Sequence, residues 1–133
     1  MGKEYKLEEF KAMKMKLKSS LSLDIQIVSD SMYPILAVEE RCTVSPYLGV
    51  DNLKRFDIII FWQANRLICH YFWRTSIALN TGKLQFMTRS LKNIYTNDVP
   101  FNEDQILGLI CDTKVKKLTQ IKIMFLNMLR GSF

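Results

Sequence analysis

Residues 28–36, VSDSMYPIL, decide how the rest of the chain is interpreted. Apolar residues alternate with polar ones over residues 23–27, LDIQI, and this period predicts a half-buried strand that ends at the stretch. Pro34 lacks a backbone donor and fixes its own φ, so a regular helix cannot continue through it. Ser31 therefore stands between a strand end and a proline-bounded turn, where a sheet edge could present a nucleophile. An ordinary polar turn is the alternative, because Ser and Asp are common turn residues.

Short apolar runs separated by turn residues continue along the chain. Residues 58–61, IIIF, form a continuous apolar run typical of a strand that is buried on both faces. Many short strands joined by turns predict a mainly β fold, a coiled antiparallel β-barrel-like domain. The other strands are expected at residues 42–44, 67–75, 84–88, 106–111 and 113–118, with turns at 45–46, 51–54, 62–66 and 80–83 and a polar loop at 89–97.

Two segments predict helices. Residues 3–21 carry apolar residues near the helical period, with acids in the first turns and lysines near the end. We expect this helix to pack on the domain or on a partner, and a basic helix lying on an anionic membrane is the alternative. Residues 121–129, IKIMFLNML, predict a last helix packed on the barrel, or an adhesive surface for a partner or a membrane. The expected organisation is an N-terminal amphipathic helix over residues 1–22 and one domain over residues 23–133.

Charge and composition narrow the classes of partner. The chain of 133 residues carries 19 Lys and Arg against 13 Asp and Glu, a net charge of +6, which favours anionic partners. No helix-turn-helix, zinc-finger or aromatic RNA-binding motif accompanies the charge, so nucleic acid is not an expected partner. A solvated basic surface is the interpretation that we favour.

The three cysteines, Cys42, Cys69 and Cys111, show neither a disulfide framework nor a metal-binding spacing. They are typical of small buried residues in a reducing compartment, and we expect no metal and no cofactor. No apolar run is long enough to span a bilayer, and no signal peptide is visible at the charged N-terminus. The expected location is cytoplasmic, with peripheral contact to a membrane as an alternative.

Four stretches, in order, resemble the signal peptidase I and LexA-like superfamily of serine peptidases. SDSMYP at residues 29–34 resembles the Ser-x-Met-x-Pro box in which the Ser is the nucleophile. KRFDIIIFW at 54–62 resembles the family's "GD-I-V-V-F" strand, and LICHYFWR at 67–74 resembles the strand that carries the general base. EDQILGLI at 103–110 resembles the closing "ILGKV" strand. The resemblance covers most of residues 24–110 and implies a peptidase fold whose nucleophile is Ser31.

The resemblance places the general base at His70, the only histidine of the chain. Family members of the endoplasmic-reticulum and archaeal type use a His there, whereas bacterial signal peptidases and LexA-like proteins use a buried Lys. A hydroxyl is a weak nucleophile until a base takes its proton, and an unperturbed His titrates near neutrality. The membrane anchor of the family's signal peptidases has no counterpart here, which favours a maturase of leader peptides over general secretion.

A third group should orient the imidazole. The His-type family supplies an Asp from a "K-G-D-N…D" stretch, which TRSLKNIYTNDVP at residues 88–100 matches incompletely. Ser90-Leu91, or Arg89-Ser90 under a one-residue shift, replaces the first Gly-Asp pair. Asp98 near the second acidic position is the candidate orienting residue, and a solvated loop Asp is the alternative.

The remaining expectations concern substrate binding. The backbone N–H of Ser31 is the natural oxyanion donor, and the hydroxyl of Ser29 is a candidate second donor. Met32 is expected to pack under the nucleophile and Pro34 to rigidify the turn. The substrate, a peptide or precursor protein, would bind extended, paired with the strand before Ser31 and with a neighbouring strand.

The sequence thus supports a serine endopeptidase with Ser31 as nucleophile, His70 as base and Asp98 as orienting residue. A Ser–His dyad of reduced activity remains open because the Gly-Asp pair is missing. The alternative function is a catalytically weakened or inactive peptide-binding module on the same fold.

Overall fold

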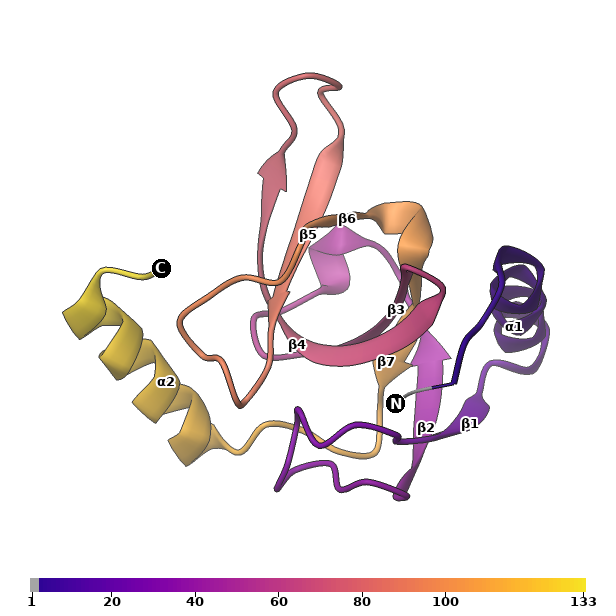
Figure 1. The fold of residues 1–133 in the computed structure, drawn as a ribbon, viewed down its shortest axis with the longest axis horizontal. Coiled ribbons are helices and arrows are strands. Elements are labelled where there is room, and N and C mark those ends of the chain that lie inside the picture. The colour runs from indigo at the N-terminus through magenta and orange to yellow at the C-terminus, as the bar shows by residue number, and fades with distance from the viewer. Residues whose placement is uncertain (1–2) are drawn as a thin grey trace.

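The computed structural model describes residues 3–133, and within them seven strands form one antiparallel sheet. The sheet has the order β1-β2-β7-β3-β4-β5-β6 and curls into the barrel-like form seen in Figure 1. This confirms the predicted mainly β fold with a helix at each end of the chain. The strands are β1 Leu23–Gln26, β2 Arg41–Pro46, β3 Ile58–Gln63, β4 Arg66–Ile77, β5 Leu84–Arg89, β6 Phe101–Asn102 and β7 Ile106–Ile110. Short 3₁₀ helices, η1 Val50–Asn52 and η2 Glu103–Gln105, interrupt the connections.

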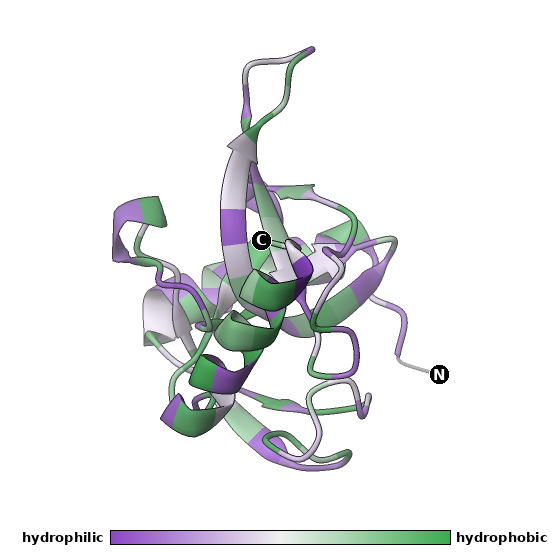
Figure 2. Ribbon diagram, turned by 90° about the vertical axis from the view of Figure 1, so that its left-hand side faces the viewer, coloured by the Kyte–Doolittle hydropathy of each residue, from purple (hydrophilic) through white to green (hydrophobic). Residues whose placement is uncertain are grey.

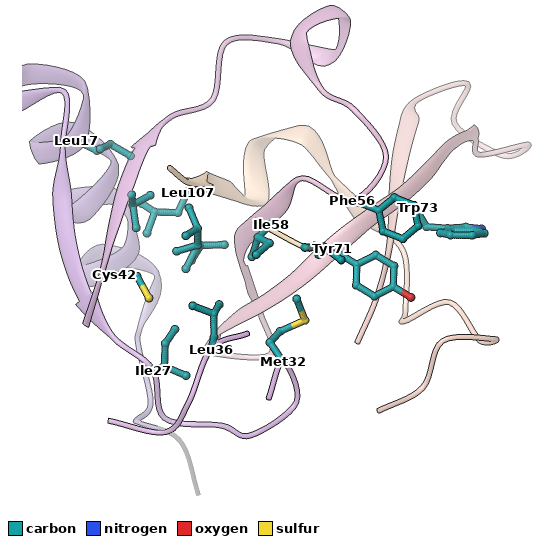
Figure 3. Packing of buried hydrophobic residues seen from close by; sticks show 14 of the residues in the cluster. Leu17, Ile27, Met32, Leu36, Cys42, Phe56, Ile58, Tyr71, Trp73 and Leu107 are labelled. Carbon is teal, nitrogen blue, oxygen red and sulfur yellow. The ribbon is translucent and has the colours of Figure 1, made fainter. Parts of the chain in front are cut away.

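Strand β3 is buried on both faces, as its apolar run predicts. Ile58 and Ile60 belong to the larger core cluster, whereas Ile59 and Phe61 belong to a second cluster on the opposite face. Figure 3 shows how the larger cluster gathers side chains from α1, from the loop after β1 and from several strands. Because successive side chains of a strand point to opposite faces, one unbroken apolar run supplies both clusters.

Strand β4 changes partners along its length, and this change positions the site. Residues 66–71 pair with β3, whereas the pairing with β5 runs from Tyr71 to Ile77. Ala64 and Asn65 form the two-residue turn between β3 and β4, and both have positive φ, as a tight hairpin with the strand twist requires. The first half of β4 therefore has one edge that β5 does not cover.

Helix α1, Leu7–Ser20, packs on the sheet through Phe10 and Leu17, which are both buried. The Phe10 ring stacks on that of Trp62, with centroids 5.5 Å apart. The prediction of a helix from residue 3 is wrong for residues 3–6, which are extended. Tyr5 N–H donates to the carbonyl of Asn65, so the hairpin turn holds this segment in a β conformation. Residues 1–2 of the predicted N-terminal segment lie outside the described residues.

Helix α2, Lys117–Arg130, confirms the predicted C-terminal helix. Ile123 and Asn127 are buried against the barrel, and Gly131 ends the helix with φ +68°. Figure 2 shows α2 facing the viewer, with hydrophobic and hydrophilic residues alternating along its outer turns. None of the helices in residues 3–133 has both the length and the apolar character that crossing a bilayer demands.

Three boundaries differ from the sequence prediction. Residues 113–118 are not a strand: the chain is irregular after β7 and α2 begins at Lys117. Val115 is the one fully buried residue of this segment, which otherwise leads into the helix. Residues 45–46 do not turn the chain but end β2, where Pro46 lies opposite Gly108 of β7. Arg89, predicted in a loop, is the last residue of β5.

Candidate active site

Ser31 stands in a compact turn directly after β1. Tyr33 N–H donates to the carbonyl of Asp30, and Leu36 N–H donates to the carbonyl of Met32, so the backbone coils tightly around the serine. Met32 is 1% exposed and belongs to the larger core cluster, and its packing beneath the nucleophile stays a prediction. Pro34 follows a cis peptide bond in the same turn. A buried methionine and a hydrogen-bonded turn thus fix the position of Ser31.

His70 faces Ser31 from the first half of β4. The distance from His70 Nε2 to Ser31 Oγ is 3.1 Å, and His70 lies opposite Ile59 in the register with β3. The imidazole meets the ring of Phe61 edge to face, with centroids 6.3 Å apart, and its side chain is only 15% exposed. A paired strand and an aromatic wall therefore hold the ring, so it is positioned before any ligand binds.

Asp98 completes a contiguous chain of polar groups. Its Oδ2 lies 2.6 Å from His70 Nδ1. A carboxylate accepts hydrogen bonds, so Nδ1 carries the ring proton and the lone pair of neutral Nε2 faces the serine hydroxyl. The structure thus brings Ser31, His70 and Asp98 together in the order that the sequence proposed, while their catalytic roles remain predictions.

Thr88 is a member of the site that the sequence did not reveal. Its hydroxyl donates to Asp98 Oδ2 at 2.8 Å, and Asp98 N–H donates back to the Thr88 carbonyl at 2.8 Å. These two bonds orient the carboxylate toward His70. Thr88 is fully buried at the end of β5. One sequence signal could have pointed to Thr88: it is a polar residue at an inward-facing position of β5, ten residues before an acid.

The loop after β5 also supports the nucleophile. Leu91 N–H donates to the carbonyl of Ser31 at 3.1 Å, and Lys92 forms an ion pair with Asp30. The hydrogen bond and charge of Lys92 lower the pKa of the Asp30 carboxyl. Leu91, one of the residues expected at the position of the missing Gly-Asp pair, therefore contacts the nucleophile turn through its backbone.

Arg89 fixes the same loop through hydrogen bonds from its buried side chain. This guanidinium is 2% exposed and donates to Asn97 Oδ1, to the carbonyl of Ile94 and to Asn127 Oδ1 of α2. Burial lowers the pKa of Arg89 from its usual value. Because Asn97 precedes Asp98, Arg89 fixes the segment that carries the acid and joins it to α2. Arg89 was predicted in a loop, and this supporting role was not predicted from the sequence.

The predicted oxyanion donors lie next to each other. Ser31 N–H donates to Ser29 Oγ at 3.2 Å. The two groups are thus adjacent to the attacking oxygen, but in this arrangement the hydroxyl of Ser29 accepts the bond of Ser31 N–H. A bound carbonyl oxygen would have to share or replace this bond.

A cleft of about 610 Å³ opens beside Ser31 and His70. Its walls are residues 25–28 of β1 and its extension, and residues 66–70 of β4. Its floor is apolar and includes Leu36 and Ile60.

Cys69, which also lines this cleft, is a rival nucleophile to Ser31 by position. Burial raises the pKa of its thiol far above the usual value, so the sulfur stays protonated and unreactive at neutral pH. Among residues 3–133, His, Cys, Asp and Glu form no group of three or more that could hold a metal ion.

Two strand edges face this cleft. Ile27 exchanges backbone hydrogen bonds with Glu39 and Glu40 on one side, so the backbone groups of its neighbours Gln26 and Val28 face the opposite way, toward the cleft. On the other wall, the residues of β4 before Tyr71 pair with β3 and not with β5, and Arg66 at the start of this edge forms a β-bridge with Glu4. No family model, curated protein or solved structure matches the chain. The proposed function therefore rests on the geometry of the site and on the sequence.

Proposed function

We propose that this protein is a serine endopeptidase of the signal-peptidase and LexA-like type. The observation that carries the proposal is the unbroken hydrogen-bonded chain from Ser31 through His70 to Asp98, which opens into a cleft. A serine–imidazole–carboxylate arrangement activates a hydroxyl wherever it recurs, because the base takes the proton and the acid stabilises the imidazolium. The ordered sequence boxes around Ser31 and His70 add support.

The chemistry follows from the geometry. Ser31 Oγ transfers its proton to His70 Nε2 and attacks the carbonyl carbon of the scissile peptide bond. The tetrahedral oxyanion accepts hydrogen bonds from the backbone of Ser31 and the hydroxyl of Ser29. His70 then gives the proton to the leaving amine, the C–N bond breaks and an acyl ester forms on Ser31. Water, deprotonated by His70, hydrolyses that ester and restores the free hydroxyl.

The substrate in this proposal is an extended peptide. The cleft-facing edges of β1 and β4 both offer backbone donors and acceptors, so a strand laid between them pairs on both sides. The apolar floor at Leu36 and Ile60 selects apolar side chains near the scissile bond. This substrate class includes peptide segments of precursor proteins, consistent with a role in peptide maturation.

The test uses two readouts. First, a fluorophosphonate is incubated with the protein and the adduct is mapped by mass spectrometry. We expect the label on Ser31, lost in Ser31→Ala and in His70→Ala, and retained in the control Ser22→Ala, whose serine is exposed and does not line the cleft. Second, a mixture of synthetic peptides is incubated with wild type and Ser31→Ala, and new termini are identified by mass spectrometry.

Cleavage that depends on both Ser31 and His70 supports the peptidase. A label on Ser31 that is unchanged in His70→Ala would contradict the assigned base. If neither label nor cleavage appears while peptides bind the wild type and Ser31→Ala equally by calorimetry, the chain is instead the peptide-binding module.

A further inference from the structure

The outer face of α2 carries an apolar stripe that the barrel leaves uncovered. Leu118 is 82% exposed and Phe125 is 55% exposed, and neither belongs to a core cluster. Residues 118, 121, 125 and 128 are spaced by three or four, and residue 129 comes four after residue 125, so all five lie on one face of the helix. The stripe, called here the α2 stripe, consists of Leu118, Ile121, Phe125, Met128 and Leu129.

The opposite face of α2 accounts for the helix's attachment to the domain. Ile123 packs in the core, and Asn127 donates to the carbonyl of Ile94 and accepts from Arg89. The helix is therefore fixed through one face, and Figure 2 shows α2 in front of the barrel, on the side nearest the viewer. A stripe of five large apolar residues in one row is more than the scattered exposure that soluble surfaces normally carry.

Cations accompany the α2 stripe. The chain after Asp112 contains no Asp or Glu, whereas Lys114, Lys116, Lys117, Lys122 and Arg130 all lie there. Lys122 is exposed and comes four residues after Leu118 and three before Phe125, so it borders the stripe. Arg130 stacks on Tyr95, which leaves the lysines as the charges facing outward.

We propose that the α2 stripe docks in the interfacial region of an anionic lipid bilayer. A helix with an apolar face and bordering lysines buries the apolar side chains at the headgroup boundary, while the long lysine stems reach up to the lipid phosphates. Charge complementarity favours an anionic bilayer over a second copy of this chain, since two such faces would bring their lysines together. The inference stands apart from the proposed peptidase activity.

Vesicle co-sedimentation of the full chain tests the inference. Vesicles of phosphatidylcholine alone are compared with vesicles that also contain phosphatidylglycerol, at low and high salt. We expect binding to the anionic vesicles that salt weakens. Phe125→Asp should weaken it about tenfold to a hundredfold, because one large apolar side chain is lost from the lipid contact. Lys122→Gln should weaken it about fivefold, because it removes one cation at the bilayer surface.

The control is Leu79→Asp, which places the same charge on a fully exposed apolar residue at the tip of the β4–β5 hairpin, away from the α2 stripe. Leu79→Asp should lose only the small part of vesicle binding that depends on net charge. It should therefore bind the anionic vesicles better than Phe125→Asp does. Met128→Ser adds a stripe variant without a new charge, and circular dichroism verifies that each variant is folded.

Three outcomes overturn the inference. The first is no sedimentation of wild type with anionic vesicles. The second is equal loss of binding in Leu79→Asp and Phe125→Asp, which would assign binding to net charge rather than to the stripe. The third is a concentration-dependent dimer in analytical ultracentrifugation that Phe125→Asp dissociates while vesicles fail to bind, which would make a second copy the occupant.

Discussion

Replacement of Asp98 by Asn tests the central reasoning, because it keeps the size of the side chain and removes its charge. Asp98 accepts from His70 Nδ1 at 2.6 Å and from the Thr88 hydroxyl at 2.8 Å. The Asn amide can still accept one of these bonds, but it cannot stabilise the imidazolium that forms when Ser31 gives up its proton. The amide N–H₂ can also face Nδ1, which forces the ring proton to Nε2 and removes the base from the serine.

The magnitude follows from the distance and the exposure. Two unit charges about 4 Å apart interact by about 4 kcal/mol at an effective dielectric constant of 20 and by about 1 kcal/mol in water. The side chains of His70 and Asp98 are 15% and 29% exposed, so the site lies nearer the first limit. A loss of about 2–4 kcal/mol in the transition state lowers the rate roughly 30- to 1,000-fold.

The assay is the second-order rate constant of Ser31 phosphonylation, because it reports serine activation without a known substrate. Asp51→Asn is the control, since it removes an equal charge from the exposed helix η1. The single histidine adds a second readout: ¹⁵N NMR of the imidazole should show the proton on Nδ1 in wild type and a population shifted to Nε2 in Asp98→Asn. A rate within threefold of wild type together with an unchanged tautomer would refute the role assigned to Asp98.

Three further results are expected. Gly108→Ala should lower the free energy of unfolding by about 1–3 kcal/mol in urea titrations, because a Cβ there would overlap the carbonyl oxygen of Ser45, and a stable variant would contradict the close approach of β7 and β2. Arg89→Met should lower it by about 2–4 kcal/mol, because buried carbonyl and amide acceptors on the loop after β5 and on α2 lose their donor, and a neutral effect would show that the guanidinium is not what holds them. Burial raises the pKa of the Cys42 thiol to about 11, so iodoacetamide at pH 8 should label exposed Cys111 and spare Cys42, whose labelling should grow only as the pH rises toward 11; early labelling of Cys42 would argue against its burial.

The sequence predicted the strands well where one physical signal dominated. The run at residues 58–61 was long, β-branched and apolar, and it is the strand whose faces supply both core clusters. The prediction of a strand at residues 113–118 was wrong. The segment is short, and Val115, its one buried residue, lies between two lysines, a pattern that resembles a strand. Its conformation is set by the helix that follows, which the local pattern does not encode. Residues 3–6 look helical by composition, but the hairpin turn at Asn65 pairs with them instead.

The site residues, too, were predictable only where a local sequence signal marked them. Ser31 and His70 could be proposed from the sequence because each lies in a short motif. The distance between them could not be predicted, because 39 residues of sequence separate them. Asp98 was one of two equal interpretations until Thr88 and His70 were seen to share its Oδ2. Thr88 and Arg89 act through tertiary contacts, and the polar position of Thr88 in β5 does not by itself reveal that its hydroxyl contacts Asp98. Side chains that support others are recognised by what they touch.

The two strand edges that face the cleft have a thermodynamic consequence. The sheet is short of one strand between β1 and the first half of β4, and an extended peptide that lies there finishes the fold from outside. A ligand that binds only the folded chain stabilises it by mass action, by about 2.7 kcal/mol at a hundredfold excess over Kd, and so raises its melting temperature. A thermal-shift screen of peptides on Ser31→Ala would therefore rank binding sequences without any turnover. In this view recognition and folding are one process, in which the ligand serves as the last element of secondary structure.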